Sequence, residues 1–298
     1  MRVVVTGVSG YIGRSLSRFL LDRGCQVIAL VREASPFAVD PRMRLLEWPP
    51  RDGTSRSYLS ATDVVVHLAS PSLAACERAP DSAFEAHLTD TNELLARFRP
   101  RERFIYLSSC SVFGYQAVPV DEDSRPTPVN AYGLMKLAAE QEVLAHTHPF
   151  PTLVLRLASV YGVGESVRSD LLLNRYVGQA VSGKPLCVAG PDLWRGFIHI
   201  ADVVRALSQI MDCSPCTARE LLCVGDPQLV MTLEQIGRAV ASRIPGTRIS
   251  LVPANADKRS YRVNLSRMRR RYGIEPTVTL SEGLMGLVRH FQAQEVPR

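Results

Sequence analysis

The sequence predicts an α/β fold: a doubly wound parallel sheet with helices on both faces and a smaller C-terminal domain. Apolar runs typical of strands alternate with helix-like segments through the first half of the chain. These runs are almost continuously apolar, which indicates strands buried on both faces. A glycine-rich stretch also joins the first run to the first helix. Together these observations favour parallel strands joined by crossover helices.

The same patterns give the expected elements and their division into domains. Strands are expected over 2–6, 26–31, 43–47, 63–69, 103–108 and 152–157. Helices are expected over 12–23, 84–98, 131–145, 170–182 and 200–212. After residue 162 the pattern becomes mixed, so we expect one domain over 1–162 and a smaller one over 163–298, with 197–225 packing back on the first.

Composition and charge exclude several classes of protein. The 298 residues are 46% hydrophobic and 21% charged, which is ordinary for a globular protein. The net charge of +6 is interleaved with acids except in a cluster at 267–273, so we expect no nucleic-acid partner. No apolar stretch approaches the roughly 18 residues of a membrane span, and we expect a cytoplasmic protein.

The cysteines indicate no disulfide framework or metal site. Their number, seven, is odd, and they are dispersed along the chain, which is typical of reduced thiols in the cytosol. Cys213 and Cys216 form a single CxxC pair without a second ligand pair, so no metal is expected.

The stretch TGVSGYIG at 6–13 predicts a dinucleotide site. It places Gly7, Gly10 and Gly13 between the first strand and the first helix. In a Rossmann-type domain the first glycine permits the tight turn, the second admits a pyrophosphate, and the third lets helix and strand pack closely. The positive end of the helix then faces the anion.

The end of the second strand favours NADP over NAD. An acidic residue there hydrogen-bonds the adenine ribose of NAD, whereas this chain has Val31 followed by Arg32. Arg32 can pair with a 2′-phosphate, and Arg14 in the first helix can supply a second charge. The alternative is that Arg32 is only a solvated strand end, so NAD remains open.

Tyr132 and Lys136 form the expected catalytic pair. In YGLMK they lie one helical turn apart on one face, and an ammonium beside a phenol lowers the pKa of the phenol. Upstream, Ser108, Ser109 and Ser111 follow the fifth strand and are expected to project over the same crevice. A serine donor beside a tyrosine acid would polarise a substrate carbonyl.

With these motifs the chain resembles the extended short-chain dehydrogenases/reductases of the NAD-dependent epimerase/dehydratase family, which act on nucleotide sugars. The resemblance covers nearly the whole chain. It rests on TGVSGYIG, DVVVHLAS, SCSVFG, YGLMK, RLASVYG, RGFIHIADV and NLSRMRRRYGIEP. It implies that Ser109 holds the reacting oxygen, Tyr132 exchanges its proton and Lys136 binds the nicotinamide ribose.

The resemblance also implies further contacts. Its cofactor residues are Gly7, Gly10, Tyr11, Ile12, Gly13, Arg14, Arg32, Asp52, Leu68, Ala69, Tyr132 and Lys136. Asp52 would lie near the adenine. Its substrate residues are Ser111, Asn174, Arg195 and Arg259, of which the two arginines match those that bind the pyrophosphate of the sugar nucleotide.

Departures from the family pattern narrow the chemistry. Family dehydratases carry an Asp-Glu pair directly after the catalytic hydroxyl, and here those positions are Cys110 and Ser111, so water elimination is not expected. His87 stands where the family has asparagine, and Phe113 stands where it has tyrosine. Neither of these two changes has an explanation in the sequence.

These residues lead to three candidate functions. The first is NADPH-dependent reduction of a nucleotide-linked 4-keto-6-deoxyhexose. The alternatives are a nucleotide-sugar 4-epimerase with retained NAD and a reductase of a non-sugar carbonyl. The resemblance further implies a homodimer formed through helices 84–98 and 131–145.

Overall fold

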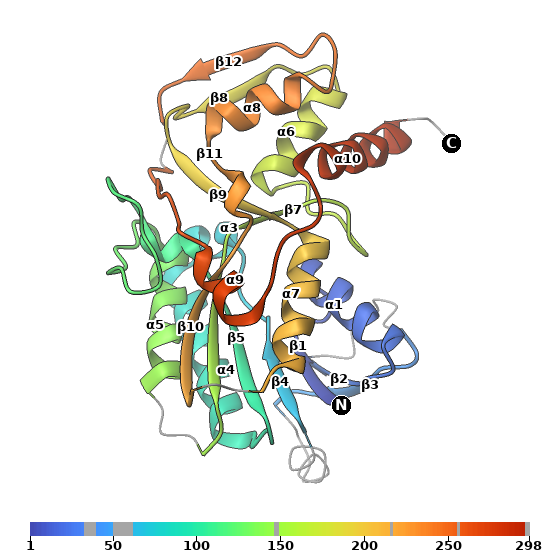
Figure 1. Ribbon diagram of the computed structural model, residues 1–298, viewed down its shortest axis with the longest axis vertical. Coiled ribbons are helices and arrows are strands. Elements are labelled where there is room, and N and C mark those ends of the chain that lie inside the picture. Colours follow the sequence, from blue (N-terminus) through green and yellow to red (C-terminus); the bar gives the residue numbers. More distant parts are fainter. Residues whose placement is uncertain (33–39, 50–61, 146–148, 215–216, 255–256, 296–298) are drawn as a thin grey trace.

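A seven-stranded sheet is the centre of the computed structural model (Figure 1). Its strand order, β10-β6-β5-β4-β1-β2-β3, follows the 3-2-1-4-5-6 order of a dinucleotide-binding sheet. All pairings between these described strands are parallel. The strands are β1 (Arg2–Thr6), β2 (Gln26–Val31), β3 (Arg44–Glu47), β4 (Val64–His67), β5 (Arg103–Ser109), β6 (Thr152–Leu157) and β10 (Arg219–Val224). The predicted fold class is confirmed.

The structure describes residues 1–32, 40–49, 62–145, 149–214, 217–254 and 257–295. Asp52, expected near the adenine, and Cys216 of the CxxC pair lie outside the described residues.

Helices cover both faces of the sheet. On one face α1 (Tyr11–Asp22) packs beside α7 (Ile200–Asp212), and on the other α4 (Pro80–Arg97) packs beside α5 (Ala131–Ala145). Strand β1 sends Val3 and Val5 into the core under α1 and α7, and Val4 into the core under α4 and α5. This alternation between two apolar layers explains why the strands are almost continuously apolar.

Strand β3 departs from the expected burial on both faces. Leu45 in this strand is 43% exposed, and Arg44 and Glu47 are exposed as well. The reason is its position, since β3 is an edge strand with β2 as its one neighbour in the sheet order. The prediction that all six strands are buried was therefore wrong for this one.

The second half of the chain lies above the carboxyl ends of these strands (Figure 1). It contains a sheet of order β11-β9-β7 and a β12-β8 pair. Its strands are β7 (Ser159–Tyr161), β8 (Leu186–Ala189), β9 (Trp194–His199), β11 (Val230–Thr232) and β12 (Ile249–Val252). Helices α6 (Leu172–Val181), α8 (Leu233–Ala241) and α10 (Leu280–Glu295) enclose a core that includes Val177, Ile236 and Leu287.

Within segment 197–225, α7 and β10 return to the first half, because α7 packs on α1 and β10 pairs with β6, whereas 197–199 belong to β9. We retain the division at residue 163 as a proposal, with the difference that β7, just before it, pairs with β9 in the sheet of the second half. The remaining described elements are α3 (Leu73–Arg78), α9 (Ser266–Tyr272), η2 (Cys110–Phe113) and η3 (Pro227–Leu229).

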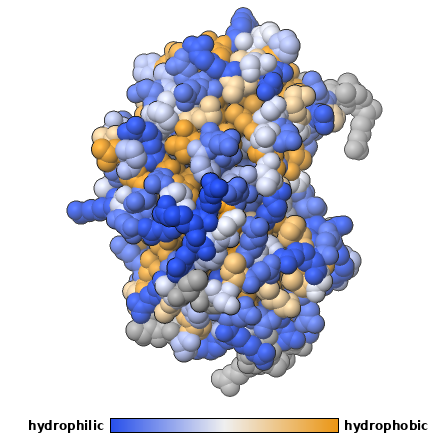
Figure 2. Space-filling model, viewed as in Figure 1, coloured by the Kyte–Doolittle hydropathy of each residue, from blue (hydrophilic) through white to orange (hydrophobic). Residues whose placement is uncertain are grey.

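Figure 2 shows hydrophilic residues spread over both halves of one face, with smaller hydrophobic areas between them. Among the described residues, no helix has the length and apolar character needed to cross a bilayer.

Candidate active site

In the glycine loop, backbone segments approach each other so closely that side chains would not fit between them. Gly7 has φ +68°, a conformation that favours glycine, and a Cβ added there would lie 2.7 Å from the Ala69 amide nitrogen. A Cβ on Gly13 would lie 2.1 Å from the Gly7 carbonyl oxygen. The loop therefore packs against its own helix and against the end of β4, as the glycine spacing predicts.

The start of α1 fits the pyrophosphate of a dinucleotide. Gly10 is its N-cap, no side chain caps the helix, and its first turn carries no acidic residue. The amide donors of this turn and the positive end of the helix are thus left for an anion. Tyr11 and Ile12 contribute backbone here, because the Tyr11 hydroxyl donates to the Gly162 carbonyl over 2.7 Å and Ile12 packs on the core. A dinucleotide fits these residues.

The two arginines expected at the adenine end already have partners. Arg32 directly follows β2, and its Nη2 lies 2.9 Å from Oδ2 of Asp90 in α4. The Arg32 side chain is 67% exposed, so the ion pair is open to exchange with another anion. Arg14 lies in the first turn of α1 and donates from Nε to the Ser9 carbonyl over 3.1 Å.

Leu68 and Ala69 follow β4 at the same edge of the sheet. The backbone N–H groups of both donate to Thr6 Oγ1, over 3.1 and 3.0 Å. Leu68 packs partly buried against the core, and Ala69 meets Gly7 as described. Both residues therefore line the glycine loop, where the resemblance puts the cofactor cleft.

Ser109, Tyr132 and Lys136 are brought together at the carboxyl end of the sheet. Ser109 ends β5 and caps η2, while Tyr132 and Lys136 lie on α5. The Ser109 hydroxyl acts on the Tyr132 phenol and lowers its pKa, although burial has the larger and opposite effect. Lys136 is buried, with Nζ 4.4 Å from the centre of the Tyr106 ring. The three expected catalytic residues thus share one site.

The electrostatics of this site differ from the expectation. Burial raises the pKa of Tyr132, and the opposing charges are those of Arg259 and Arg168 rather than Lys136. Burial also lowers the pKa of Lys136 to about 7, so its ammonium is only partly populated at neutral pH. Without coenzyme, Tyr132 therefore keeps its proton and is in the form that an acid needs.

Ser108 does not face the crevice. Its hydroxyl donates to the Glu140 carboxylate in the core under α5, and only Ser109 and Ser111 lie together. Successive side chains of a strand point to opposite faces, so the expectation that all three serines project over one crevice was wrong for Ser108. Cys110 points away as well, with Sγ 3.3 Å from the Arg156 carbonyl.

An arginine pair stands behind Ser111. Arg259 donates from Nη1 to Ser111 Oγ over 2.7 Å, and its Nε and Nη2 hold the two oxygens of Asp257, each over 2.7 Å. Arg195 is 3% exposed, donates to the carbonyls of Trp194 and Arg259, and lies 3.2 Å from Asp257. Of the two arginines assigned to the pyrophosphate, Arg259 therefore contacts Ser111, and Arg195 supports it from the interior.

Asn174 organises the loop after β7. Its side chain is fully buried, accepting from the Gly162 amide and donating to the Arg168 carbonyl, each over 3.0 Å. A substrate contact for Asn174 stays a prediction. Sequence reasoning missed Arg168, which pairs with Asp170 and acts on the pKa of Tyr132. No pattern in the sequence marks Arg168 or Asp257, since long-range folding brings each to the site.

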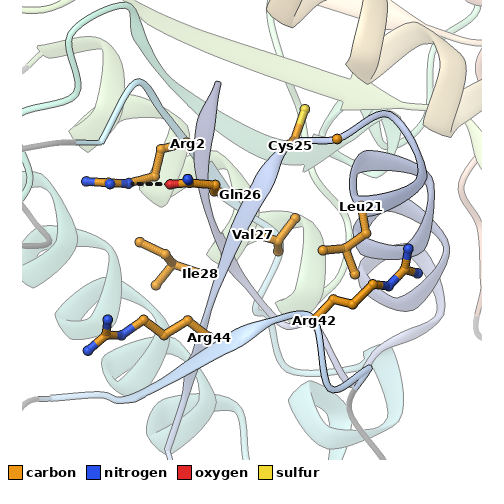
Figure 3. Close-up of a pocket in the computed structure, with 9 residues that line it drawn as sticks. Arg2, Leu21, Cys25, Gln26, Val27, Ile28, Arg42 and Arg44 are labelled. Carbon is orange, nitrogen blue, oxygen red and sulfur yellow. Dashed lines mark hydrogen bonds between the residues drawn. The ribbon is translucent and has the colours of Figure 1, made fainter.

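A separate hollow of about 370 Å³ lies at the other end of the sheet (Figure 3). It is lined at the starts of β1, β2 and β3 by Arg2, Gln26 and Arg44, with Arg42 beside them. Arg2 donates to Gln26 over 3.2 Å, and Arg42 is paired with Asp22 and Asp40. Ligands of open α/β sheets bind at the carboxyl ends of the strands, so this hollow is not part of the site.

Known proteins resemble this chain over nearly its full length. It is 25% identical over 311 residues to the GDP-6-deoxy-D-mannose reductase of Pseudomonas aeruginosa, covering 98% of each chain. It is 25% identical to the uncharacterized UDP-glucose epimerase YtcB of Bacillus subtilis, covering 95% of this chain and 96% of the other. The solved structure of MoeE5 with UDP-glucose and NAD matches with a TM-score of 0.83 and 25% identity over 100% of both chains.

The family follows from these matches. The NAD dependent epimerase/dehydratase family matches residues 3–215, a range that begins within β1 and includes all of α7. The matched segment contains the loop and the Ser109, Tyr132 and Lys136 constellation described above, together with most strands of the central sheet. The chain belongs to the NAD-dependent epimerase/dehydratase family and is an enzyme of the extended short-chain dehydrogenase/reductase type.

Proposed function

We propose that this enzyme reduces the 4-keto group of a nucleotide-linked 4-keto-6-deoxyhexose with NADPH. The observation that carries the proposal is that Ser109 at the end of β5 and Tyr132 on α5 act together in one buried site, where burial raises the pKa of the tyrosine. A phenol that retains its proton is an acid, which is the role that reduction of a carbonyl requires.

The residues then have separate roles. When bound, the coenzyme supplies a hydride to the carbonyl carbon. Tyr132 donates its phenolic proton to the carbonyl oxygen, and Ser109 donates a hydrogen bond to the same oxygen. Lys136 holds the nicotinamide ribose, and its ammonium stabilises the tyrosinate left behind. A proton from water restores Tyr132.

Arg32 and Arg14 support NADP as the coenzyme. The Arg32 guanidinium is exposed at the end of β2, and a 2′-phosphate can replace Asp90 as its partner in a bidentate pair. Arg14 lies in the first turn of α1, the helix that faces the pyrophosphate. NAD remains the alternative, because MoeE5, the solved structure described above, was determined with NAD.

The sugar class rests on the site and on one relative. The positions after Ser109 are Cys110 and Ser111, which provide no carboxylate for dehydration. The GDP-6-deoxy-D-mannose reductase resembles this chain over 98% of its length. We assign Arg259, with Arg195 behind it, to the anionic part of the sugar nucleotide, and Ser111 and Asn174 to the substrate side.

The test is reduction of a 4-keto-6-deoxy sugar nucleotide. The purified enzyme is mixed with NADPH and GDP-4-keto-6-deoxymannose or its dTDP-glucose counterpart, and absorbance at the reduced-coenzyme band is followed. We expect a decline that requires both substrates and is lost in Tyr132→Phe. No decline with either sugar nucleotide would reject this substrate class.

The second candidate is a nucleotide-sugar 4-epimerase. The resemblance to the Bacillus subtilis epimerase favours it. The three expected catalytic residues are compatible with both reactions. An epimerase returns the hydride to the carbon it came from and retains its NAD. Tightly bound NAD in the purified protein, with interconversion of UDP-glucose and UDP-galactose, would replace the first proposal by this one.

A reductase of a non-sugar carbonyl is the third candidate. A quinoline-oxide ketoreductase of Stigmatella aurantiaca is 33% identical to this chain over 189 residues, 58% of the chain. Arg259, held beside the catalytic serines, argues for an anionic substrate instead. Turnover of neutral ketones, but not of sugar nucleotides, would favour the third candidate.

We further propose a homodimer, located in the cytoplasm. Helices α4 and α5 pack on each other, and Phe84 and Leu134 on them are 37% and 51% exposed. A groove of about 610 Å³ on α4 is lined by Phe84, Leu88 and Asn92, among others. Light scattering should give twice the chain mass, and Phe84→Glu with Leu134→Glu should halve it. The control Leu251→Glu, on exposed β12, should not.

A further inference from the structure

His87 is linked to the catalytic lysine through one aromatic ring. Its Nε2 lies 2.8 Å from the Tyr106 hydroxyl. Lys136 Nζ lies over the face of the same Tyr106 ring, 4.4 Å from the ring centre. His87 and Tyr106 are 2% and 0% exposed. They come from α4 and β5, and Lys136 from α5, so three elements meet at this link.

The hydrogen bonds around His87 hold it in place. Thr6 Oγ1 already accepts two backbone N–H groups, so its one hydroxyl proton goes to Nδ1 of His67, over 2.8 Å. His67 is then neutral with its proton on Nε2, which donates to Thr91 Oγ1 over 3.1 Å. Thr91 donates in turn to the His87 carbonyl over 2.7 Å. The glycine-loop strand thereby fixes the helical turn that carries His87.

The rings stack as a buried cluster beside Lys136. The His67 and His87 rings are 5.6 Å apart with an interplanar angle of 23°, and His67 lies 5.6 Å from the Tyr106 ring. Burial and the positive charge of Lys136 lower the pKa of both histidines, for His67 to about 3. Both rings are therefore neutral and add no charge next to the ammonium.

Besides the Tyr106 ring, two titratable groups act on Lys136. Glu140, one turn along α5, raises the pKa of Lys136 but is held by Arg156 through contacts of 2.8 and 3.1 Å. Cys76 of α3 raises it as well. The electron-rich face of an aromatic ring favours an ammonium over a neutral amine, so the ring opposes the cost of burial.

We propose that His87 is a positioning residue that holds the Tyr106 ring against the Lys136 ammonium and so keeps this lysine charged in the coenzyme cleft. The proposal rests on the proposed role of Lys136 at the coenzyme ribose. It explains why this chain tolerates histidine where its family has asparagine, since the longer side chain reaches the Tyr106 hydroxyl. His87 touches neither coenzyme nor substrate in this role.

Coenzyme affinity as a function of pH tests the link without any substrate. Dissociation constants for NADPH and NADH are measured by fluorescence between pH 6 and 9. The variants are His87→Leu, His87→Gln, Tyr106→Phe and their combination. Phe104→Leu, on the same face of β5 and in the same core, is the control for lost packing.

We expect His87→Leu and Tyr106→Phe to weaken binding about three- to tenfold at pH 8, the range of a desolvated cation–π contact, and less than about twofold at pH 6. His87→Gln, which can still reach the hydroxyl, should restore most of the affinity. The double variant should match the singles, because both break one link. Phe104→Leu should lower stability without changing the pH at which affinity falls.

The outcomes separate this inference from the proposed function. If His87→Leu keeps the wild-type pH dependence, or if Phe104→Leu shifts it equally, the link does not exist. Should His87→Leu not fold, Tyr106→Phe, which removes only an oxygen atom, tests the same step. A shift in coenzyme binding combined with no turnover of 4-keto sugar nucleotides would support the link and reject the proposed substrate.

Discussion

Arg259 lies 2.7 Å from Ser111 Oγ, and the Ser109 hydroxyl donates to the same oxygen over 3.0 Å. The Arg259 guanidinium is thus connected through Ser111 to Ser109, the expected catalytic serine. Its charge also reaches Tyr132, whose pKa it lowers against the effect of burial. The acid strength of the tyrosine therefore depends on an arginine that is far from it in the sequence.

Tyr132→Phe should remove the proton donor and leave the cleft intact. We expect kcat for carbonyl reduction to fall about 10²- to 10⁴-fold, the usual contribution of an acid/base group, with coenzyme affinity changed less than about twofold. Steady-state kinetics and a coenzyme titration measure the two effects. Equal losses in both would mean that the tyrosine mainly shapes the cleft.

Arg259→Gln should raise the pKa of Tyr132, because a nearby cation that favours the phenolate is removed. In alcohol oxidation, where the tyrosine must be deprotonated, the rise of kcat with pH should move to higher pH. Arg262→Gln is the matched control, since it removes the same charge from a half-buried side chain that donates to the Ala117 carbonyl at the surface. The Arg259 assignment fails if both variants give the same profile.

Arg32→Gln should raise KM for NADPH about tenfold or more, the size expected for a lost hydrogen-bonded charge, and leave KM for NADH unchanged. Asp90→Asn tests the same contact from the other side, because it removes the carboxylate that competes for Arg32. It should lower KM for NADPH or leave it unaltered. A wild-type enzyme that prefers NADH would reject the NADP proposal.

Stability should fall in acid because His67 is buried in its neutral form. Burial lowers its pKa from the ordinary value of 6.5 to about 3, so below pH 6.5 the unfolded chain binds a proton that the folded chain does not. This one group lowers the free energy of unfolding by up to about 1.4 kcal/mol per pH unit between those values. Urea unfolding between pH 7 and 4.5 measures the slope, which should be shallower in His67→Gln. An identical slope in that variant would assign the acid sensitivity to other groups.

Much of the fold is predictable because its signals are local. Buried parallel strands require continuous apolar runs, and β1, β2 and β6 have the predicted bounds. The signal of the glycine loop is equally local, because glycine is the residue that fits both the positive φ at Gly7 and the close backbone contact at Gly13. Strand β3 was misjudged because an edge position depends on the order of strands and not on the sequence of one strand.

The site was predictable only in part, because its geometry depends on the direction of side chains and on distant contacts. Tyr132 and Lys136 share a helix, so their spacing predicts their proximity. The Tyr106 ring that faces Lys136 comes from strand β5, and Arg168 and Asp257 come from loops of the second half. Their effects on charge arise only when the chain has folded.

The hydrogen bond from Tyr11 to Gly162 joins the start of α1 to the loop that follows β7. Tyr11 begins α1, whose N-terminus we assign to the coenzyme pyrophosphate, and Gly162 opens the loop that carries Arg168. We expect a coenzyme bound at the start of α1 to restrict the motion of this loop as well, through the same hydrogen bond. We therefore expect ordered binding, in which the coenzyme binds first and the proposed sugar-nucleotide substrate binds second, next to a loop that is already ordered.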